Sequence, residues 1–506
     1  MRKLAVILFC LYFIAPQKIA AQQIVYSDFK NEDNKEIDFE ILGKIGTSYI
    51  IYKNIRWKHM LAIYDENMRM EKSVRLKFIP DKTFNIDFIT YPDHFFIIYQ
   101  FEKSNVVYCN AVKIDADGKK LTEPVTLDTT RISLLADNKI YNTVSSQDKQ
   151  KIMIYKIPRK NQQITIATKL FDAELNMLDS TREVGAFDDR KDIYSELLLD
   201  NEGDFVYTKG VKSSLLRNIA ALDVVCRKPG AKSSKIINIH LRNNYIDETI
   251  MKIDNLNKRF IFNSFYYTKD PGNIQGIFTG VIDAVYMDTI RSAFNVLPDT
   301  IRAQVNSQGL LKEAFNNFFI RQAIIKKDGG FILTTEDFST QVRSNSNTNW
   351  DRSNYLYNSH YTNDYYSPTT EYLYYRPTGN FNNLIDVRYF YEDILILSLD
   401  GNLNMQWNTV IPKTQSDTEV DNFLSFSTMN VGGEIHFLYN EGERRQIMSN
   451  HSVLPNGELK RYPTLKSREA GYEFMPRLAK QVGYREMIIP CVYRSNIAFA
   501  KVNFPE

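Results

Sequence analysis

The sequence predicts an all-β fold in which a unit of roughly 50 residues, made of short strands, repeats about eight times. The first observation behind this prediction is a recurring pattern of an apolar strand, a polar turn and an amphipathic strand. The turn positions are Asp65, Asp115, Asp172, Asp400 and Pro455. Asp, Asn and Gly suit such turns because they tolerate positive φ or bond their own backbone.

The second observation is a strongly apolar strand upstream of each unit. The eight strands of this kind begin at Ser48, Phe95, Lys151, Asp204, Arg259, Gly330, Glu434 and Arg485. Five of the seven intervals between these starts are 47 to 56 residues long. Four short strands in about 50 residues match one β-propeller blade, so eight blades are predicted. Seven blades are the alternative, and an open array of sandwiches is a third possibility.

The two ends of the chain are predicted to share the last blade. The final unit offers strands near 473–481, at 485–493 and at 496–504, and it lacks a fourth. QIVYSDF (23–29) is apolar enough to supply that strand. Closure of this kind removes open sheet edges, which otherwise favour aggregation. We therefore expect one domain over residues 22–506, with seven blades if 23–29 does not pair.

Each of the two long intervals contains an insertion. The first, at about 303–319, holds SQGLLKEAFNNFF (307–319), where apolar residues recur at helical spacing up to Phe318 and Phe319. It predicts a helix that packs on the propeller. The second, at about 339–390, holds SNYLYNSHYTNDYYSPTTEYLYYRP (353–377), which contains eight tyrosines.

The tyrosine-rich insertion is the predicted binding site. Tyr, Ser and Asn dominate antibody binding loops because tyrosine gives a large contact area at low entropic cost. Aromatic faces also stack on sugar rings. The predicted binding residues are Trp350, Tyr355, Tyr357, Tyr361, Tyr365, Tyr366, Tyr372, Tyr374 and Tyr375. The alternative interpretation is a self-packed excursion without a binding role.

The first 21 residues have the layout of a signal peptide. Arg2 and Lys3 precede an apolar core, and Ala20–Ala21 offers a cleavage site. The core is shorter than the ~20 residues that span a bilayer, and no later segment predicts a transmembrane anchor. We expect an exported protein, periplasmic or extracellular. Removing residues 1–21 leaves 60 basic and 60 acidic side chains. The mature chain therefore has no net positive charge that would attract nucleic acid.

Few residues suggest catalysis or metal binding. Cys109, Cys226 and Cys491 stand alone in apolar runs and are expected to be buried thiols. The six histidines lack metal-ligand spacing, and no phosphate- or dinucleotide-binding motif occurs, so we expect no metal and no cofactor. Carboxylates on the innermost strands would face the channel of a propeller, where two of them about 5–10 Å apart suit glycoside hydrolysis. The candidates are Asp87, Glu196 and Glu473, the last with Arg477. The sequence leaves open whether they form a site.

This repeat layout resembles that of secreted β-propeller proteins. Three features resemble those of exported proteins of the phylum Bacteroidota: the Ala21–Gln22 junction, the Asn- and Tyr-rich composition and four Asp-Ser/Thr motifs. Those proteins carry O-glycans at such motifs. The motifs start at Asp128, Asp179, Asp288 and Asp299. The resemblance implies a non-catalytic propeller that binds a protein or a glycan. A polysaccharide hydrolase or lyase with this fold is the alternative. The ligand and the oligomeric state stay open.

Overall fold

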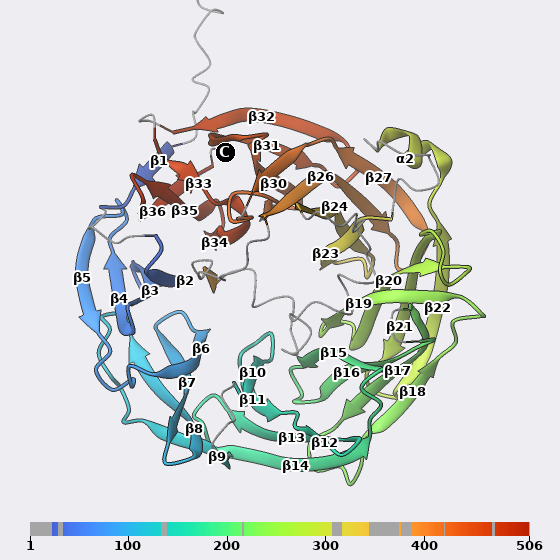
Figure 1. Ribbon diagram of the computed structural model, residues 1–506, viewed down its shortest axis with the longest axis horizontal. Coiled ribbons are helices and arrows are strands. Elements are labelled where there is room, and N and C mark those ends of the chain that lie inside the picture. The colour runs from blue at the N-terminus through green and yellow to red at the C-terminus, as the bar shows by residue number, and fades with distance from the viewer. Residues whose placement is uncertain are drawn as a thin grey trace, which may run out of the picture.

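The computed structural model describes residues 23–28, 34–132, 139–214, 217–305, 316–343, 374–375, 386–418, 420–467 and 471–504. Their strands form seven antiparallel sheets, which we number in chain order. Figure 1 shows these sheets side by side around a ring, with β2, β6, β10, β15 and β19 nearest its centre. The chain is therefore all-β and resembles a propeller in its arrangement.

The first three sheets come from the N-terminal part of the chain. Sheet 1 contains β2 (Ile37–Ile45), β3 (Ser48–Ile55), β4 (Lys58–Tyr64), β5 (Met70–Arg75) and β25 (Tyr374–Tyr375). Sheet 2 contains β6 (Thr83–Thr90), β7 (His94–Lys103), β8 (Val106–Asp115) and β9 (Val125–Arg131). Sheet 3 contains β10 (Asn142–Ser145), β11 (Lys151–Lys156), β12 (Arg159–Lys160), β13 (Gln163–Asp172) and β14 (Met177–Ala186).

Sheet 4 has eight strands, and sheet 5 contains the two longest strands of the described chain. Sheet 4 contains β15 (Asp192–Leu199), β16 (Phe205–Lys212), β17 (Ile219–Arg227), β18 (Lys235–Ile239), β19 (Tyr245–Asp254), β20 (Arg259–Tyr267), β21 (Gly276–Asp283) and β22 (Asp288–Val296). Sheet 5 contains β23 (Phe318–Ile325), β24 (Phe331–Arg343), β26 (Asp386–Leu399), β27 (Met405–Ile411) and β28 (Gln415–Thr418).

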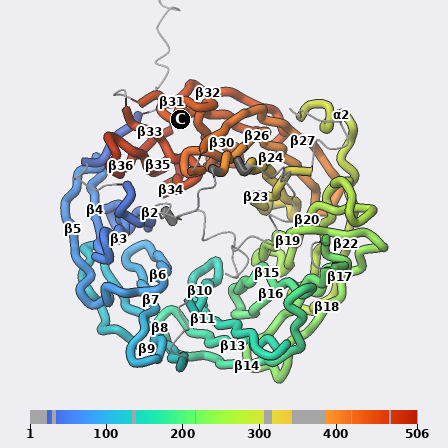
Figure 2. Tube along the Cα trace, in the orientation of Figure 1, coloured from blue at the N-terminus to red at the C-terminus, as the bar shows by residue number. Residues whose placement is uncertain are grey.

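The last two sheets return to the start of the ring. Sheet 6 contains β29 (Ser427–Val431), β30 (Glu434–Glu441), β31 (Arg444–Val453) and β32 (Leu459–Lys466). Sheet 7 contains β33 (Glu473–Phe474), β34 (Lys480–Gly483), β35 (Glu486–Tyr493), β36 (Asn496–Asn503) and β1 (Gln23–Tyr26). In Figure 2 the colour passes once round the ring from blue to red, so sequence neighbours are also neighbours in space.

The eight apolar strands predicted from the sequence are all present. They are β3, β7, β11, β16, β20, β24, β30 and β35. Each pairs with a strand on both sides, and neighbouring sheets cover its faces, so its side chains are buried almost continuously; all but the first residue of β20 are buried. Two of them, β16 and β20, share sheet 4. A single paired position, Ile219 with Ile246, joins their two halves.

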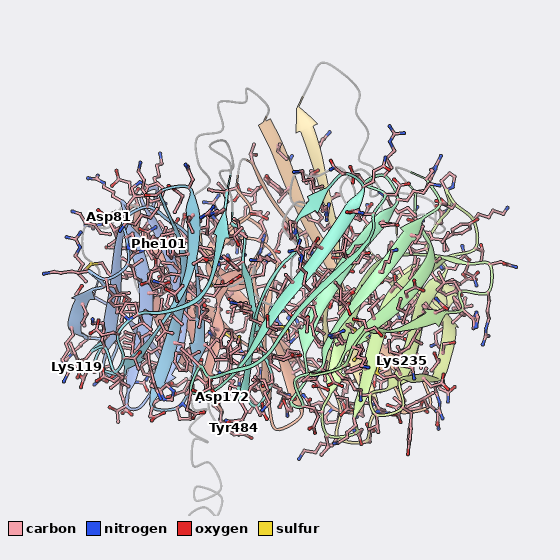
Figure 3. The ribbon with its side chains drawn as sticks, turned by 90° about the horizontal axis from the view of Figure 1, so that it is seen from below. Asp81, Phe101, Lys119, Asp172, Lys235 and Tyr484 are labelled. Carbon is pink, nitrogen blue, oxygen red and sulfur yellow. The ribbon has the colours of Figure 1, made fainter. Side chains whose placement is uncertain are left out.

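The predicted Asp turns are confirmed, and they share one geometry. In the turn between β13 and β14, the Asp172 carboxylate accepts hydrogen bonds from the backbone N–H groups of Glu174 (3.0 Å) and Asn176 (2.8 Å). Leu175 takes the left-handed conformation, with φ of 65°. The same pair of bonds recurs at Asp65, Asp115, Asp200 and Asp400. In Figure 3, Asp172 and Lys119 mark the lower face, where such turns lie.

The predicted pairing between the two ends of the chain is present. Strand β1 pairs with β36, from Gln23 opposite Asn503 to Tyr26 opposite Ala500. Ser27 extends the contact, because its N–H donates to the Phe499 carbonyl (2.8 Å) and its Oγ accepts from the Phe499 N–H (3.0 Å). The N-terminal strand therefore belongs to the same sheet as the last strand.

The predicted helix at 307–319 is wrong at its C-terminal end. Phe318 and Phe319 begin β23, where they pair with Asp337 and Glu336 of β24 and are buried. An isolated apolar pair fits both the helical and the strand period, and the sheet partner decides between them. Residues 306–315 lie outside the described residues. The described helices are α2 (Asp299–Gln304) and the short 3-10 helix η2 (Pro476–Leu478).

The core lies between neighbouring sheets. One cluster joins Ile250 of sheet 4 to Ile320 and Leu397 of sheet 5, and others pack the remaining sheets in the same way. Cys109, Cys226 and Cys491 are buried and free, as predicted, and burial raises the pKa of each thiol well above its usual range. Within the described residues, no helix is long and apolar enough to cross a bilayer.

Candidate functional site

One sheet extends beyond the ring. Strands β24 and β26 have 13 and 14 residues, and they pair with each other past the end of β23. Strand β28 continues the extension by pairing with residues 388–391 of β26. We call residues 338–343, 386–391 and 415–418 the projecting ladder. Figure 3 shows its yellow and orange strands rising above the upper face, opposite the Asp turns. Residues 339–343 and 386–390 therefore belong to paired strands rather than to the predicted insertion.

Four carboxylates gather where the ladder leaves the ring. Glu336 and Asp337 lie at a register shift in β24. Glu392 and Asp393 lie where β26 changes its partner from β27 to β28. This group is not predicted from the sequence, because each acidic pair stands inside an apolar strand. The available signal was the recurrence of such a pair on both sides of the insertion.

Two cations neutralise part of this buried group. The fully buried Glu336 carboxylate pairs with Arg321 Nε (3.0 Å) and Lys413 Nζ (2.9 Å), and it accepts a hydrogen bond from Ser425 Oγ (2.7 Å). The Lys413 backbone N–H donates to Asp393 Oδ1 (3.2 Å). Burial lowers the pKa of Lys413, and Glu336 opposes that shift. Because a buried ion is stable only when paired, these contacts fix the position of the ladder root.

Asp337 differs from its neighbours. Burial raises its pKa to about 8, and the nearby Glu392 and Asp393 carboxylates act in the same direction. The side chain therefore keeps its proton at neutral pH. A second contact ties the ladder to sheet 7, because Tyr391 donates to Asp421 Oδ2 (2.8 Å) and Arg477 of η2 pairs with the same carboxylate.

A cleft of about 360 Å³ opens at the foot of the ladder. Its lining comes from the ladder, from the segment between β28 and β29, from the turn between β30 and β31 with the start of β31, and from the start of sheet 7. The lining residues are Arg388, Ser416, Asp417, Thr418, Phe423, Leu424, Gly442, Glu443, Arg445 and Glu473. Arg445 crosses the floor of the cleft. Its guanidinium pairs with Asp417 (2.7 Å) and Glu473 (3.4 Å) and lies over the ring of Phe423, 4.2 Å from the centroid.

The carboxylates predicted to face the channel lie on three different sheets. Asp87 is on β6 and Glu473 is on β33, where it lines the cleft. Glu196 on β15 is buried and accepts a hydrogen bond from the Met251 N–H (3.0 Å), and burial raises its pKa to about 8. Among the described residues, no group of three or more His, Cys, Asp or Glu side chains is placed to hold a metal ion.

Glu40 of β2 is a further partly buried carboxyl that the sequence does not predict. Burial raises its pKa to about 7, Lys480 of β34 opposes the shift, and Asp87 reinforces it. Lys480 donates a hydrogen bond to the Ile41 carbonyl (2.9 Å). These three ionisable side chains come from sheets 1, 2 and 7, so they bring charged groups of three sheets close to one another.

Two predicted binding residues belong to a strand that pairs with the strand of Glu40. Tyr374 and Tyr375 form β25, which pairs with Glu40 and Phe39 of β2. This pairing places Tyr374 and Tyr375 at the edge of sheet 1. The other predicted binding residues lie outside the described residues: Trp350, Tyr355, Tyr357, Tyr361, Tyr365, Tyr366 and Tyr372.

No protein-family model and no curated protein matches the sequence. Solved structures match with low scores. A structure from a study of two prolyl endopeptidases is 8% identical (TM-score 0.42) over 92% of this chain, which spans 55% of that chain. The dihydro-heme d1 dehydrogenase NirN is 11% identical (0.39), over 97% of this chain and 78% of that one. The polysaccharide lyase Uly1 is 8% identical (TM-score 0.38), over 82% of this chain and 89% of that one. At these scores the similarities carry no conclusion about activity.

Proposed function

We propose that this chain is an exported, non-catalytic eight-bladed β-propeller that binds a protein ligand on its upper face. The eight blades are the four-strand groups around β3, β7, β11, β16, β20, β24, β30 and β35, with sheet 4 counted as two blades. The pairing of β1 with β36 supports closure by the N-terminal strand. Removal of residues 1–21 on export places the mature chain in the periplasm or outside the cell.

The projecting ladder and its cleft are the observation that carries this proposal. A strand pair that leaves the ring exposes backbone and side chains that the core does not need, and the buried ion pairs at its root hold it in place. Among the residues that line the cleft, the aromatic ring is that of Phe423, which is buried under Arg445. A stacked sugar needs an open ring face, so the cleft favours a polypeptide over a neutral glycan.

The resemblance to exported proteins also supports this assignment. In all four Asp-Ser/Thr motifs the hydroxyl residue is exposed: Thr129, Ser180, Thr289 and Thr300. We further propose that the predicted aromatic residues, from Trp350 to Tyr375, contribute to binding of the protein ligand. Aromatic side chains carry much of the binding energy of protein interfaces.

Replacement of residues 344–385 by a short Gly-Ser linker tests the proposal. This change leaves β24 and β26 intact and removes the two-residue strand β25 from the edge of sheet 1. Loop entropy grows slowly with length and β25 contributes two paired positions, so the ring should melt within a few degrees of the wild type. We expect the variant to lose a partner that the wild-type protein retains when both are cross-linked in the native host. A folded variant that keeps the same partner would show that the tyrosine-rich segment does not bind it.

A second candidate function, a polysaccharide hydrolase or lyase, is favoured by one observation. Glu40 has a pKa of about 7 and lies in the field of Asp87, and a carboxyl with such a pKa suits general acid catalysis. The test measures new reducing ends or unsaturated products from a panel of polysaccharides. Activity in the wild type that is lost in Glu40→Gln would establish the enzyme, and no product from the wild type would exclude it for that panel.

A further inference from the structure

Two charged side chains on different sheets line the cleft, and neither forms an ion pair with another described side chain. Arg388 belongs to the projecting ladder of sheet 5, and Glu443 belongs to the turn between β30 and β31 of sheet 6. Both are exposed. The other charged lining residues, Arg445, Asp417 and Glu473, form a closed group of ion pairs. Among the described residues that line the cleft, Arg388 and Glu443 therefore remain as one unpaired charge of each sign.

Two contacts fix the position of the Arg388 guanidinium. Its Nη2 donates to Ser416 Oγ (2.9 Å), and its guanidinium lies over the Phe390 ring, 5.0 Å from the centroid. Within the described part of the chain, no carboxylate forms an ion pair with it. A guanidinium has five N–H donors in a planar fork, so most of them stay available for a carboxylate. Three arginines near the ladder, Arg321, Arg445 and Arg477, each have an acidic partner.

Glu443 stands in the complementary position. It lies between Gly442, whose φ is 58°, and Arg444, the first residue of β31. The described residues provide no cation that pairs with its carboxylate, although Arg445 is two residues away and commits its guanidinium to Asp417 and Glu473 instead. A ligand cation on this side of the cleft would therefore meet an unsatisfied acceptor.

We propose that the cleft recognises a polypeptide segment that carries both an acidic and a basic side chain, with the acidic group bound by Arg388 and the basic group by Glu443. This inference rests on the proposed function, because it takes the upper face as the face that binds a protein. A purely acidic segment fits less well, since Asp417, Glu443 and Glu473 outnumber the two arginines of the lining. A purely basic segment would leave Arg388 unpaired and partly desolvated.

The experiment uses residues 22–506 and a phage-displayed library of random 12-residue peptides. The proteins compared are the wild type, Arg388→Gln, Glu443→Gln and the matched control Arg444→Gln. Arg444 is exposed and adjacent to Glu443 but does not line the cleft. Thermal melts verify that all variants fold, since exposed substitutions usually change stability little. A glycan array with charged and neutral oligosaccharides is run in parallel.

We expect the wild type and Arg444→Gln to enrich peptides with one acidic and one basic residue at a fixed spacing. Arg388→Gln should lose the acidic preference alone, and Glu443→Gln should lose the basic preference alone. For the best synthetic peptide, each of the two substitutions should weaken binding by about fivefold or more, as expected for a charge-assisted hydrogen bond. The exchanged pair Arg388→Glu with Glu443→Lys should select the two charges in reversed order.

Three results would overturn the inference: no enrichment by the folded wild type, the same enriched motif in Arg388→Gln or Glu443→Gln, or binding of charged glycans without binding of peptides. These results are separable from failure of the proposed function. Suppose that Arg388→Gln and Glu443→Gln retain the host partner that the linker variant loses. The upper face then still binds a protein, and only the proposed recognition of acidic and basic side chains by Arg388 and Glu443 is wrong.

Discussion

At the root of the projecting ladder, individual residues decide whether the extension keeps its place. Glu336 serves two cations, Arg321 and Lys413, while Asp337 keeps a proton because its neighbours are also acidic. Neither role is visible in a linear sequence, since the partners of Glu336 are 15 and 77 residues away along the chain. By contrast, the three cysteines were assigned correctly, because a lone cysteine in an apolar run needs no partner to be buried.

Asp337→Asn should change the pH dependence of stability. The folded-state pKa of about 8 lies above the value of about 3.9 in an unfolded chain, so the stabilising protonated state is lost as pH rises through this window. The asparagine variant cannot ionise. We expect it to be more stable than the wild type at pH 9 and nearly equal below about pH 4, as measured by urea unfolding. Parallel pH profiles for the two proteins would show that Asp337 ionises normally.

Glu336→Ala should be strongly destabilising. It leaves Arg321 and Lys413 buried without their shared carboxylate, which typically costs about 3–5 kcal/mol. The control is Glu202→Ala, which breaks the exposed pair with Lys258 (3.2 Å) and should cost less than about 1 kcal/mol. Equal losses of unfolding free energy in the two variants would refute a special role for the buried site.

At the scale of elements, local patterns determined what the sequence could predict. The Asp turns and the eight apolar strands were predictable, because each depends on residues close together in the chain. The pairing of β25 with β2 was not, since a two-residue strand carries no periodicity and its partner lies more than 300 residues away. The same limit explains Phe318 and Phe319, whose strand depends on pairing with β24. The sequence did not predict the full length of β24 and β26, because the polar residues at their ends are typical of a loop.

Asp172→Ala tests the repeated turn. The carboxylate accepts two backbone hydrogen bonds, so its loss should cost about 1–3 kcal/mol, whereas Glu174→Ala in the same turn should be nearly neutral. Although burial alone would raise it, hydrogen bonds from Asn176 and Glu174 hold the pKa of Asp172 below its ordinary value. The stabilisation is therefore present above about pH 4 and is lost on acidification. A turn contribution that persists at pH 2 would contradict this assignment.

At the scale of the whole molecule, the features that stabilise the ring and the proposed binding site lie in different parts of the chain. The ends meet in sheet 7, the Asp turns occupy the lower face, and the ladder with its cleft projects from the upper face. The proposed closure makes a specific prediction. Deletion of residues 22–28 should expose the edge of β36, lower the melting temperature and produce oligomers in size-exclusion chromatography. A monomer that melts with the wild type would show that β1 does not close the ring.

The most direct test of the account is photo-cross-linking in the native host, with a benzophenone amino acid placed at one position at a time. Thr418 and Arg444 report on the upper face beside the cleft, and Lys235 and Tyr484 report on the lower face. If the upper face binds a protein, the two upper positions should give a discrete protein adduct and the two lower positions should give none. Adducts confined to the lower face, or no adduct from any of the four positions, would contradict the claim that the upper face binds a protein.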